Sequence, residues 1–240
     1  MYNISLNDNL LRLVEGKRVA VIGPAPYLIG KNNGATIDKY DIIIRINSFS
    51  VPDNVTIDYG SRADIMFHNF GTPWMNLLKT KISDKPNKFS ELKMLGCLAI
   101  KSTHSETNFM SWEDGYISDV VKNSDSINTN NVPFYWIGVK DYKKLHSIIG
   151  CEPYQGVLSL AVLIKYPIKE LFVSGFTFYQ GDTSFKSLYY DGYRNDNTRF
   201  NGAPHGKGSI EKSISFVKNL VQENDKVLNL DPEIKRIIKI

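Results

Sequence analysis

The chain has 240 residues, of which 42% are hydrophobic and 22% are charged. This composition is typical of a globular protein with a sizeable core, and it excludes disordered, collagenous and coiled-coil chains. The 29 Lys and Arg against 25 Asp and Glu leave a net charge of +4. Because the basic residues are spread along the chain, we expect no nucleic-acid partner. We expect a single domain over residues 1–240.

The two cysteines, Cys97 and Cys151, are too few for a disulfide framework and form no CxxC pair. They therefore predict a reducing compartment and no structural zinc site. The N-terminal residues have no secretory pattern, and the apolar runs near 42–46 and 157–164 are shorter than the ~20 residues that a membrane helix needs. The expected location is the cytoplasm.

Short apolar runs along the chain predict β-strands. Residues 18–23 and 41–46 are rich in β-branched side chains and lack polar alternation, which is typical of strands buried on both faces. The other predicted strands are residues 63–67, 95–100, 134–137 and 171–175.

Helical patterns lie between and after these strands, at residues 74–78, 156–165 and 209–224. Strands that alternate with helices favour an α/β fold, with a Rossmann-like parallel sheet, flanking helices and right-handed crossovers. Two segments have neither the periodicity of a helix nor that of a strand. We expect a loop insertion at 101–131 and a lid at 179–204, because long loops in compact domains are usually functional.

The first predicted strand ends in a turn at Gly23, which is followed by Pro24, Ala25 and Pro26. Such a turn lies at the carboxyl edge of the sheet, where open α/β folds bind nucleotides. The chain lacks the GxGxxG pattern here, and the two prolines have no amide proton to donate to a phosphate. A tight turn without a ligand remains an alternative.

The sequence around this turn resembles the large sialyl-motif of the sialyltransferase family. Residues 18–49 and 58–70 carry a glycine turn, then G-x-x-I-D-x-x-D-x-x-x-R-x-N, then D-x-G. Residues 154–176 are similar to the small sialyl-motif, a helix opened by a glycine and a strand ending in Gly-Phe. The large-motif positions are Gly34, Ile37, Asp38, Asp41, Arg45, Asn47, Asp58 and Gly60.

Shorter likenesses follow in the family's order. Residues 174–179 read S-G-F-T-F-Y and are similar to the S-G-x-x-F-Y turn of bacterial sialyltransferases, and residues 188–191 are similar to an aromatic-acid motif. His205 stands where the family has the catalytic histidine of its last motif, and Glu211 is similar to the acid of that motif. Together these resemblances cover most of the chain.

The resemblance implies a GT-A-like variant of the Rossmann-like fold and an inverting glycosyltransferase. The enzyme would move an acidic sugar, sialic acid or Kdo, from its CMP ester to a hydroxyl of an oligosaccharide or glycolipid. A glycolipid acceptor would place it at the periphery of a membrane. His205 is then the general base, since an imidazole with a pKa near ~6.5 is largely neutral at pH 7. No DxD motif is present, so we expect no metal cofactor, and tyrosine hydroxyls would stabilise the leaving phosphate.

The predicted donor-binding residues gather at strand ends and at a helix start. Asn47 ends a strand and offers both donors and acceptors, Asn69 follows the next strand, and Gly156 opens a helix whose first amides carry partial positive charge. A turn-capping Asn47 and an ordinary helix start at Gly156 remain alternatives. His68 is a second histidine near this cleft. The full set is Gly23, Pro24, Ala25, Asn47, Asn69, Gln155, Gly156, Gly175, Phe176, Tyr179, Tyr189 and Tyr190.

The chain departs from the family pattern at several positions. Pro24 replaces an asparagine, Gln155 a serine or threonine, and Leu188 a histidine, while Glu211 lies one residue further from His205 than usual. The changes at Pro24 and Gln155 motivate an alternative, a non-catalytic CMP- or glycan-binding module on a degenerate transferase fold. The first glycine turn motivates another, a Rossmann-type oxidoreductase, against which the missing GxGxxG counts.

Overall fold

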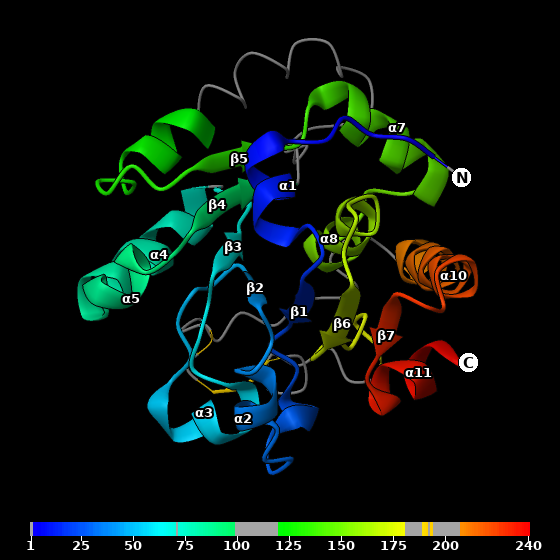
Figure 1. The fold of residues 1–240 in the computed structure, drawn as a ribbon, viewed down its shortest axis with the longest axis horizontal. Helices are drawn as coiled ribbons and strands as arrows, with labels where there is room; N and C mark the ends of the chain where they lie inside the picture. The colour runs from blue at the N-terminus through cyan, green and yellow to red at the C-terminus, as the bar shows by residue number, and fades with distance from the viewer. Residues whose placement is uncertain (1, 71, 99–119, 181–188, 192, 194–206) are drawn as a thin grey trace.

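The computed structural model describes residues 2–70, 72–98, 120–180, 189–191, 193 and 207–240. In these residues a seven-stranded sheet has the order β5-β4-β3-β2-β1-β6-β7, and every neighbouring pair is parallel. The strand order reverses at β1, so β2 and β6 flank it on opposite sides (Figure 1). The strands are β1 Arg18–Ile22, β2 Ile42–Ile46, β3 Ile65–Phe67, β4 Met94–Cys97, β5 Phe134–Trp136, β6 Glu170–Ser174 and β7 Leu228–Leu230.

The central strands are buried on both faces because side chains alternate between two layers of helices. In β1, Val19 and Val21 join the core cluster on one face, whereas Ala20 and Ile22 join the cluster on the other. This two-sided burial explains why the strand sequences are apolar without alternation.

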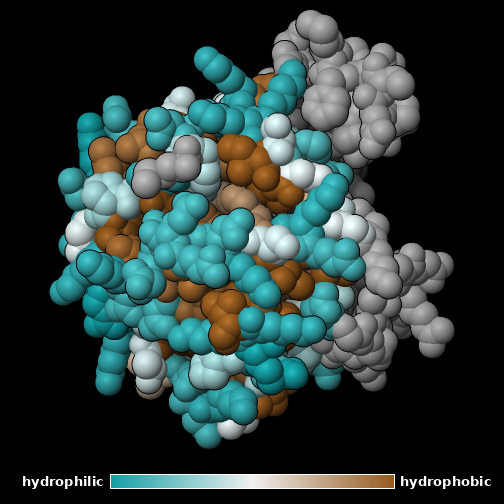
Figure 2. Space-filling view, turned by 90° about the vertical axis from the view of Figure 1, so that its right-hand side faces the viewer, coloured by the Kyte–Doolittle hydropathy of each residue, from teal (hydrophilic) through white to brown (hydrophobic). Residues whose placement is uncertain are grey.

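Five helices contribute to the core cluster on the first face. The longest, α10, buries Ile210, Ser213, Val217 and Leu220 at helical spacing and packs on its neighbours α7 and α8. Seen from the side of α10, the surface of the described residues carries hydrophilic side chains with hydrophobic ones between them (Figure 2). The five helices are α1 Asp8–Val14, α7 Val139–Ile149, α8 Gln155–Leu163, α10 Lys207–Glu223 and α11 Pro232–Ile238.

The opposite face carries shorter elements in two clusters. Leu28 and Tyr59 pack beneath β1 and β2, while Met75 and Phe89 pack beneath β3 and β4. The elements on this face are the 3-10 helices η1 Pro26–Leu28 and η2 Asp53–Val55 and the α-helices α2 Gly34–Ile37, α3 Thr56–Tyr59, α4 Thr72–Asp84 and α5 Pro86–Ser90.

The structure confirms the predicted α/β class and each predicted strand, apart from residues 99–100, which lie outside the described residues. The expected loop at 101–131 is wrong for residues 120–125, which are helical. That short helix forms because Val120 is buried and the Asn123 side chain donates a hydrogen bond to the Phe70 carbonyl at 2.7 Å. Most of the predicted lid lies outside the described residues. No helix in the described part of the chain is long and apolar enough to cross a membrane.

Candidate active site

A pocket opens where β1, β2 and β6 end. Pro24 follows β1, Asn47 follows β2, Gly175 follows β6, and Gln155 comes from the first turn of α8. The space between its lining residues amounts to about 650 Å³, which includes space open to solvent. It lies at the point where the strand order reverses, and this is where open α/β folds bind their ligands.

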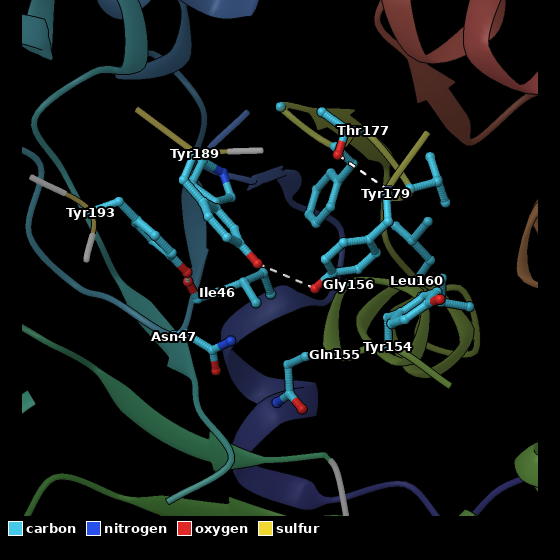
Figure 3. A pocket seen from close by; sticks show the side chains of 15 residues that line it. Ile46, Asn47, Tyr154, Gln155, Gly156, Leu160, Thr177, Tyr179, Tyr189 and Tyr193 are labelled. Atoms are coloured by element: carbon cyan, nitrogen blue, oxygen red, sulfur yellow. Dashed lines mark hydrogen bonds between the residues drawn. The ribbon is translucent and has the colours of Figure 1, made fainter. Parts of the chain in front are cut away.

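Aromatic side chains line two walls of the pocket (Figure 3). Tyr189 and Tyr193 stack with ring centroids 5.0 Å apart, and Tyr154 and Tyr179 pack with centroids 4.7 Å apart. The hydroxyls of Tyr179 and Tyr189 are 3.3 Å apart and share a hydrogen bond across the pocket. The site therefore offers flat apolar surfaces together with hydroxyl groups.

Two amide side chains, those of Asn47 and Gln155, line this pocket (Figure 3). Asn47 has φ +56°, a left-handed conformation that asparagine tolerates, and its N–H donates to the Phe67 carbonyl at 2.7 Å. Asn47 Oδ1 and both polar atoms of Gln155 are buried and have no hydrogen-bond partner among the described residues. An unpartnered buried polar group costs about 1–3 kcal/mol, so these atoms are well placed to bind a polar ligand.

The first turn of α8 forms another part of the wall. Gly156 packs directly against Phe176, and a Cβ added at Gly156 would lie 2.8 Å from Phe176 Cδ1. The N-cap residue, Tyr154, makes no side-chain cap. Since the N-cap side chain does not occupy them, the first amides of this helix can attract an anion at the pocket.

The charged residues of the large motif brace the loop behind the pocket rather than enter it. The Arg45 side chain donates to the carbonyls of Tyr59, Gly60 and Arg62 at 2.8, 3.1 and 3.0 Å. Asp38 accepts hydrogen bonds from the Ser61 and Arg62 amides. Burial lowers the pKa of Arg45 to about 10, so it stays charged at neutral pH. These contacts hold the end of β2 in place, and Asn47 follows directly after it.

The structure brings most of the predicted donor-binding residues into this one pocket. Gly23 and Ala25 do not line it. The backbone of Gly23 packs directly against that of Gly175, and the Gly23 N–H donates to the Ser174 carbonyl at 2.8 Å. The Ala25 carbonyl accepts from the Tyr59 hydroxyl at 2.7 Å. The predicted residues that line the pocket are Pro24, Asn47, Gln155, Gly156, Gly175, Phe176, Tyr179 and Tyr189.

Tyr190 is not among the tyrosines of this pocket. Its ring is only 4% exposed and lies edge-on to Tyr59, with centroids 4.6 Å apart. Burial raises the pKa of Tyr190 to about 12. Its backbone N–H donates to the Pro24 carbonyl at 3.0 Å. Tyr190 therefore fastens the aromatic segment to the β1 turn, and it lines a smaller adjoining hollow with Arg45.

His68 and Asn69 also lie outside the pocket lining. His68 is 1% exposed, and its Nδ1 accepts a hydrogen bond from the Phe70 N–H at 2.8 Å. Burial lowers the pKa of His68 to about 3, so the imidazole is neutral and enclosed. The idea that His68 is a second base near the cleft is thus not supported by its position. Asn69 is buried as well.

The last motif is only partly described. His205 and Leu188 lie outside the described residues. Glu211 is exposed on α10 and lines a groove with Tyr2 and Phe216, not the pocket at the strand ends. The described residues contain no group of three or more His, Cys, Asp or Glu side chains placed to hold a metal ion.

Sequence reasoning missed several residues that form the site. Tyr154 and Tyr193 contribute rings to the walls, and the Tyr193 hydroxyl donates to the Ile46 carbonyl at 2.7 Å. Tyr193 lies in the same aromatic cluster as Tyr189, so its sequence position gave a usable signal. The contact between Tyr193 and the end of β2 had no such signal, because it joins residues 147 positions apart.

Comparison with solved structures shows that the fold is shared. The alpha-2,3-sialyltransferase Cst-I from Campylobacter jejuni is 17% identical, with a TM-score of 0.57, 96% of this chain covered and 78% of that chain. A mammalian sialyltransferase is 15% identical, with a TM-score of 0.53 and coverages of 95% and 73%. A mammalian sialyltransferase in complex with Gal-beta-1-3GalNAc-ortho-nitrophenol is 16% identical, with a TM-score of 0.51 and coverages of 95% and 74%.

No curated protein matches the sequence. The family model for glycosyltransferase family 29 (sialyltransferase) matches residues 8–224. That span contains the three strands whose ends form the pocket and the helix that carries Gln155. The family match and the predicted sialyl-motifs thus agree along nearly the whole chain, and the chain belongs to glycosyltransferase family 29, the sialyltransferase family.

Proposed function

We propose that this enzyme is an inverting glycosyltransferase that moves an acidic sugar from its CMP ester to a hydroxyl of a glycan. Sialic acid is the sugar that the family favours, and Kdo is the second candidate. The acceptor is the terminal sugar of an oligosaccharide or glycolipid, and a glycolipid would bring a cytoplasmic enzyme to a membrane surface. The observation that carries the proposal is the pocket in which Asn47 and Gln155 present unpartnered polar atoms.

The chemistry of the pocket suits the CMP part of the donor. Amide groups that both donate and accept match the polar edges of a pyrimidine or a ribose. Tyrosine rings supply stacking surfaces, and the Tyr179 and Tyr189 hydroxyls can donate to phosphate oxygens as negative charge develops there. In this proposal the hydroxyls and the first amides of α8 stabilise the leaving phosphate without a metal ion.

His205 is the proposed general base. It takes the proton of the acceptor hydroxyl while the hydroxyl oxygen forms a bond to the anomeric carbon of the sugar. On the opposite side of that carbon, the C–O bond to the phosphate breaks and CMP leaves with the electron pair. The support for His205 is its place in the last sialyl-motif of the sequence, and a free imidazole is of the type that can act as a base near neutral pH.

Release of CMP tests the proposal. The protein is incubated with CMP-sialic acid or CMP-Kdo, with and without EDTA, and free CMP is measured. We expect release from at least one donor, no effect of EDTA, and a loss of at least ~100-fold in His205→Ala, since general base catalysis contributes ~100- to 10,000-fold. His146→Ala is the matched control, because His146 lies on α7 and does not line the pocket.

Two results would contradict the proposal. No CMP release from either donor would remove the transferase function, and equal release by His205→Ala would remove His205 as the base. If CMP bound tightly in calorimetry while neither donor turned over, the protein would be a binding module on a transferase fold. Proton NMR of the first product reports inversion, because the sugar then has the opposite anomeric configuration from the donor.

A further inference from the structure

A buried carboxylate lies behind the pocket wall, at the junction of β7 and α11. Asp231 is 6% exposed and caps α11, where its Oδ1 accepts from the Ile234 N–H at 2.7 Å. Its Oδ2 accepts from the Ser174 hydroxyl at 2.6 Å and from the Gly175 N–H at 3.2 Å. Asp231 therefore joins the C-terminal helix to the last residue of β6 and to the turn that follows it.

The hydroxyl of Tyr27, in η1, completes this network. It donates to Asp231 Oδ2 at 2.7 Å and accepts from the N–H groups of Gly175 at 2.8 Å and Phe176 at 3.1 Å. Both amides of the turn thus point away from the pocket, toward Tyr27. Since Tyr27 and Asp231 are 204 positions apart, the network joins the two ends of the chain at the turn.

The held turn forms part of the pocket. Gly175 and Phe176 both line it, and Phe176 packs against Gly156 at the start of α8. Gly175 has φ +82° and lies so close to Gly23 that a side chain at either glycine would overlap the other backbone. A small rotation of this turn would move the Phe176 ring and alter the space beside Gln155.

We propose that Tyr27 and Asp231 are positioning residues that set the donor affinity of this enzyme by holding the Gly175–Phe176 turn in place. The inference rests on the proposed function, because it concerns the pocket that would bind CMP. It extends the site beyond the residues that touch the ligand, and Asp231 lies outside residues 8–224, which the family model matches.

Strand β6 carries a second pair of a tyrosine hydroxyl and a carboxylate, at its N-terminal end. The Tyr40 hydroxyl donates to Glu170 Oε1 at 3.0 Å, where β6 begins. The chemistry is the same, a tyrosine hydroxyl bound to a carboxylate, but neither residue lines the pocket. Tyr40→Phe therefore removes an equivalent hydrogen bond from β6 without touching the turn.

The experiment compares the full-length protein with Tyr27→Phe and Tyr40→Phe. Calorimetry gives the Kd for CMP, and hydrogen exchange followed by mass spectrometry reports the amides of residues 170–180. In Tyr27→Phe we expect CMP to bind roughly 5- to 10-fold more weakly. The amides of Gly175 and Phe176 should exchange faster, because Phe176 loses its acceptor and Gly175 keeps only the longer bond to Asp231. Tyr40→Phe should match the unmodified protein in its Kd for CMP and in the exchange of the turn amides. Asp231→Asn, which keeps an acceptor for the Ile234 N–H, should weaken CMP binding in the same direction.

Unchanged CMP affinity in Tyr27→Phe, or an equal loss in Tyr40→Phe, would overturn the inference. Unchanged exchange in the turn would overturn it as well. If the unmodified protein bound no CMP, the proposed function would fail. The exchange comparison alone would then decide whether the pair holds the turn.

Discussion

Lys81 on α4 donates a hydrogen bond from Nζ to the backbone carbonyl of Tyr193 at 2.9 Å. The same ammonium donates to the Ser48 hydroxyl at 3.0 Å and lies 5.1 Å from the centre of the Tyr193 ring. Tyr193 in turn stacks on Tyr189 and bonds to the end of β2. Lys81 thus connects helix α4 to the aromatic wall that Tyr189 and Tyr193 form.

The charge of Lys81 should make CMP binding depend on pH. Burial lowers the pKa of Lys81 to about 8, so the folded protein loses this charge as the pH rises through that value. A charged hydrogen bond contributes roughly 1 kcal/mol more than a neutral one, and that difference corresponds to about a 5-fold change in affinity.

Calorimetry at pH 7 and pH 9 checks this prediction. The unmodified protein should bind CMP up to about 5-fold more weakly at pH 9. Lys81→Met should bind weakly at both values, whereas Lys79→Met, on the exposed face of the same helix, should follow the unmodified protein. A Lys81→Met variant with the same affinity and the same pH profile would show that the tether has no role in binding.

His68 should make the fold sensitive to acid. Burial lowers its pKa in the folded protein to about 3, from the ordinary value of 6.5. Between these values the unfolded chain binds a proton that the folded chain does not, so stability is fully present above pH 6.5 and is lost as the pH falls toward 3. The loss is at most about 1.4 kcal/mol per pH unit.

Urea unfolding at pH 7 and pH 5 measures this effect. From His68 alone, the free energy of unfolding should drop by roughly 2 kcal/mol between the two values. His68→Asn keeps a side-chain acceptor for the Phe70 N–H and does not titrate, so its drop should be smaller by about that amount. Equal drops in the two proteins would mean that His68 is not held neutral in the folded state.

Gly156→Ala should damage the pocket while the fold is retained. An added methyl would overlap the Phe176 ring, and because a side chain yields more easily than backbone, the ring should move within the pocket. We expect CMP to bind at least ~5-fold more weakly, since overpacking costs about 1–3 kcal/mol.

Gly138→Ala is the matched control, because a Cβ at that helix N-cap meets nothing within 4 Å. Near-UV circular dichroism separates a local change from a loss of the fold. CMP binding by Gly156→Ala at the affinity of Gly138→Ala would contradict the close packing of α8 on the turn.

The order of strands and helices in the middle of the chain was predictable, because the sequences of β1, β2 and β6 are mostly apolar and lack polar alternation. The C-terminal β7 and α11 were missed, although Asp231 and Pro232 form a typical helix start. The α1 and α7 helices were also missed, because each buries only a narrow apolar stripe.

The site was predictable where a strand end or a helix start carries a polar residue, as Asn47 and Gln155 show. Assigning the same role to two residues because they are adjacent in the sequence was less reliable. Tyr189 and Tyr190 are adjacent, yet the Tyr189 ring lines the pocket and the Tyr190 ring packs on Tyr59 in the core. The supporting contacts of Tyr27 with Asp231 and of Lys81 with Tyr193 join distant segments, and no local pattern in the sequence indicates them.

The central claim is that the pocket at the ends of β1, β2 and β6 binds CMP through Asn47. Titration calorimetry with CMP tests it most directly, using Asn76→Ala as a control because Asn76 is exposed on α4. We predict one CMP per chain, unchanged binding in Asn76→Ala and at least ~5-fold weaker binding in Asn47→Ala, since a buried polar group of the ligand that loses its partner costs about 1–3 kcal/mol. Equal binding by Asn47→Ala and the unmodified protein, or no binding by the unmodified protein, would contradict the claim.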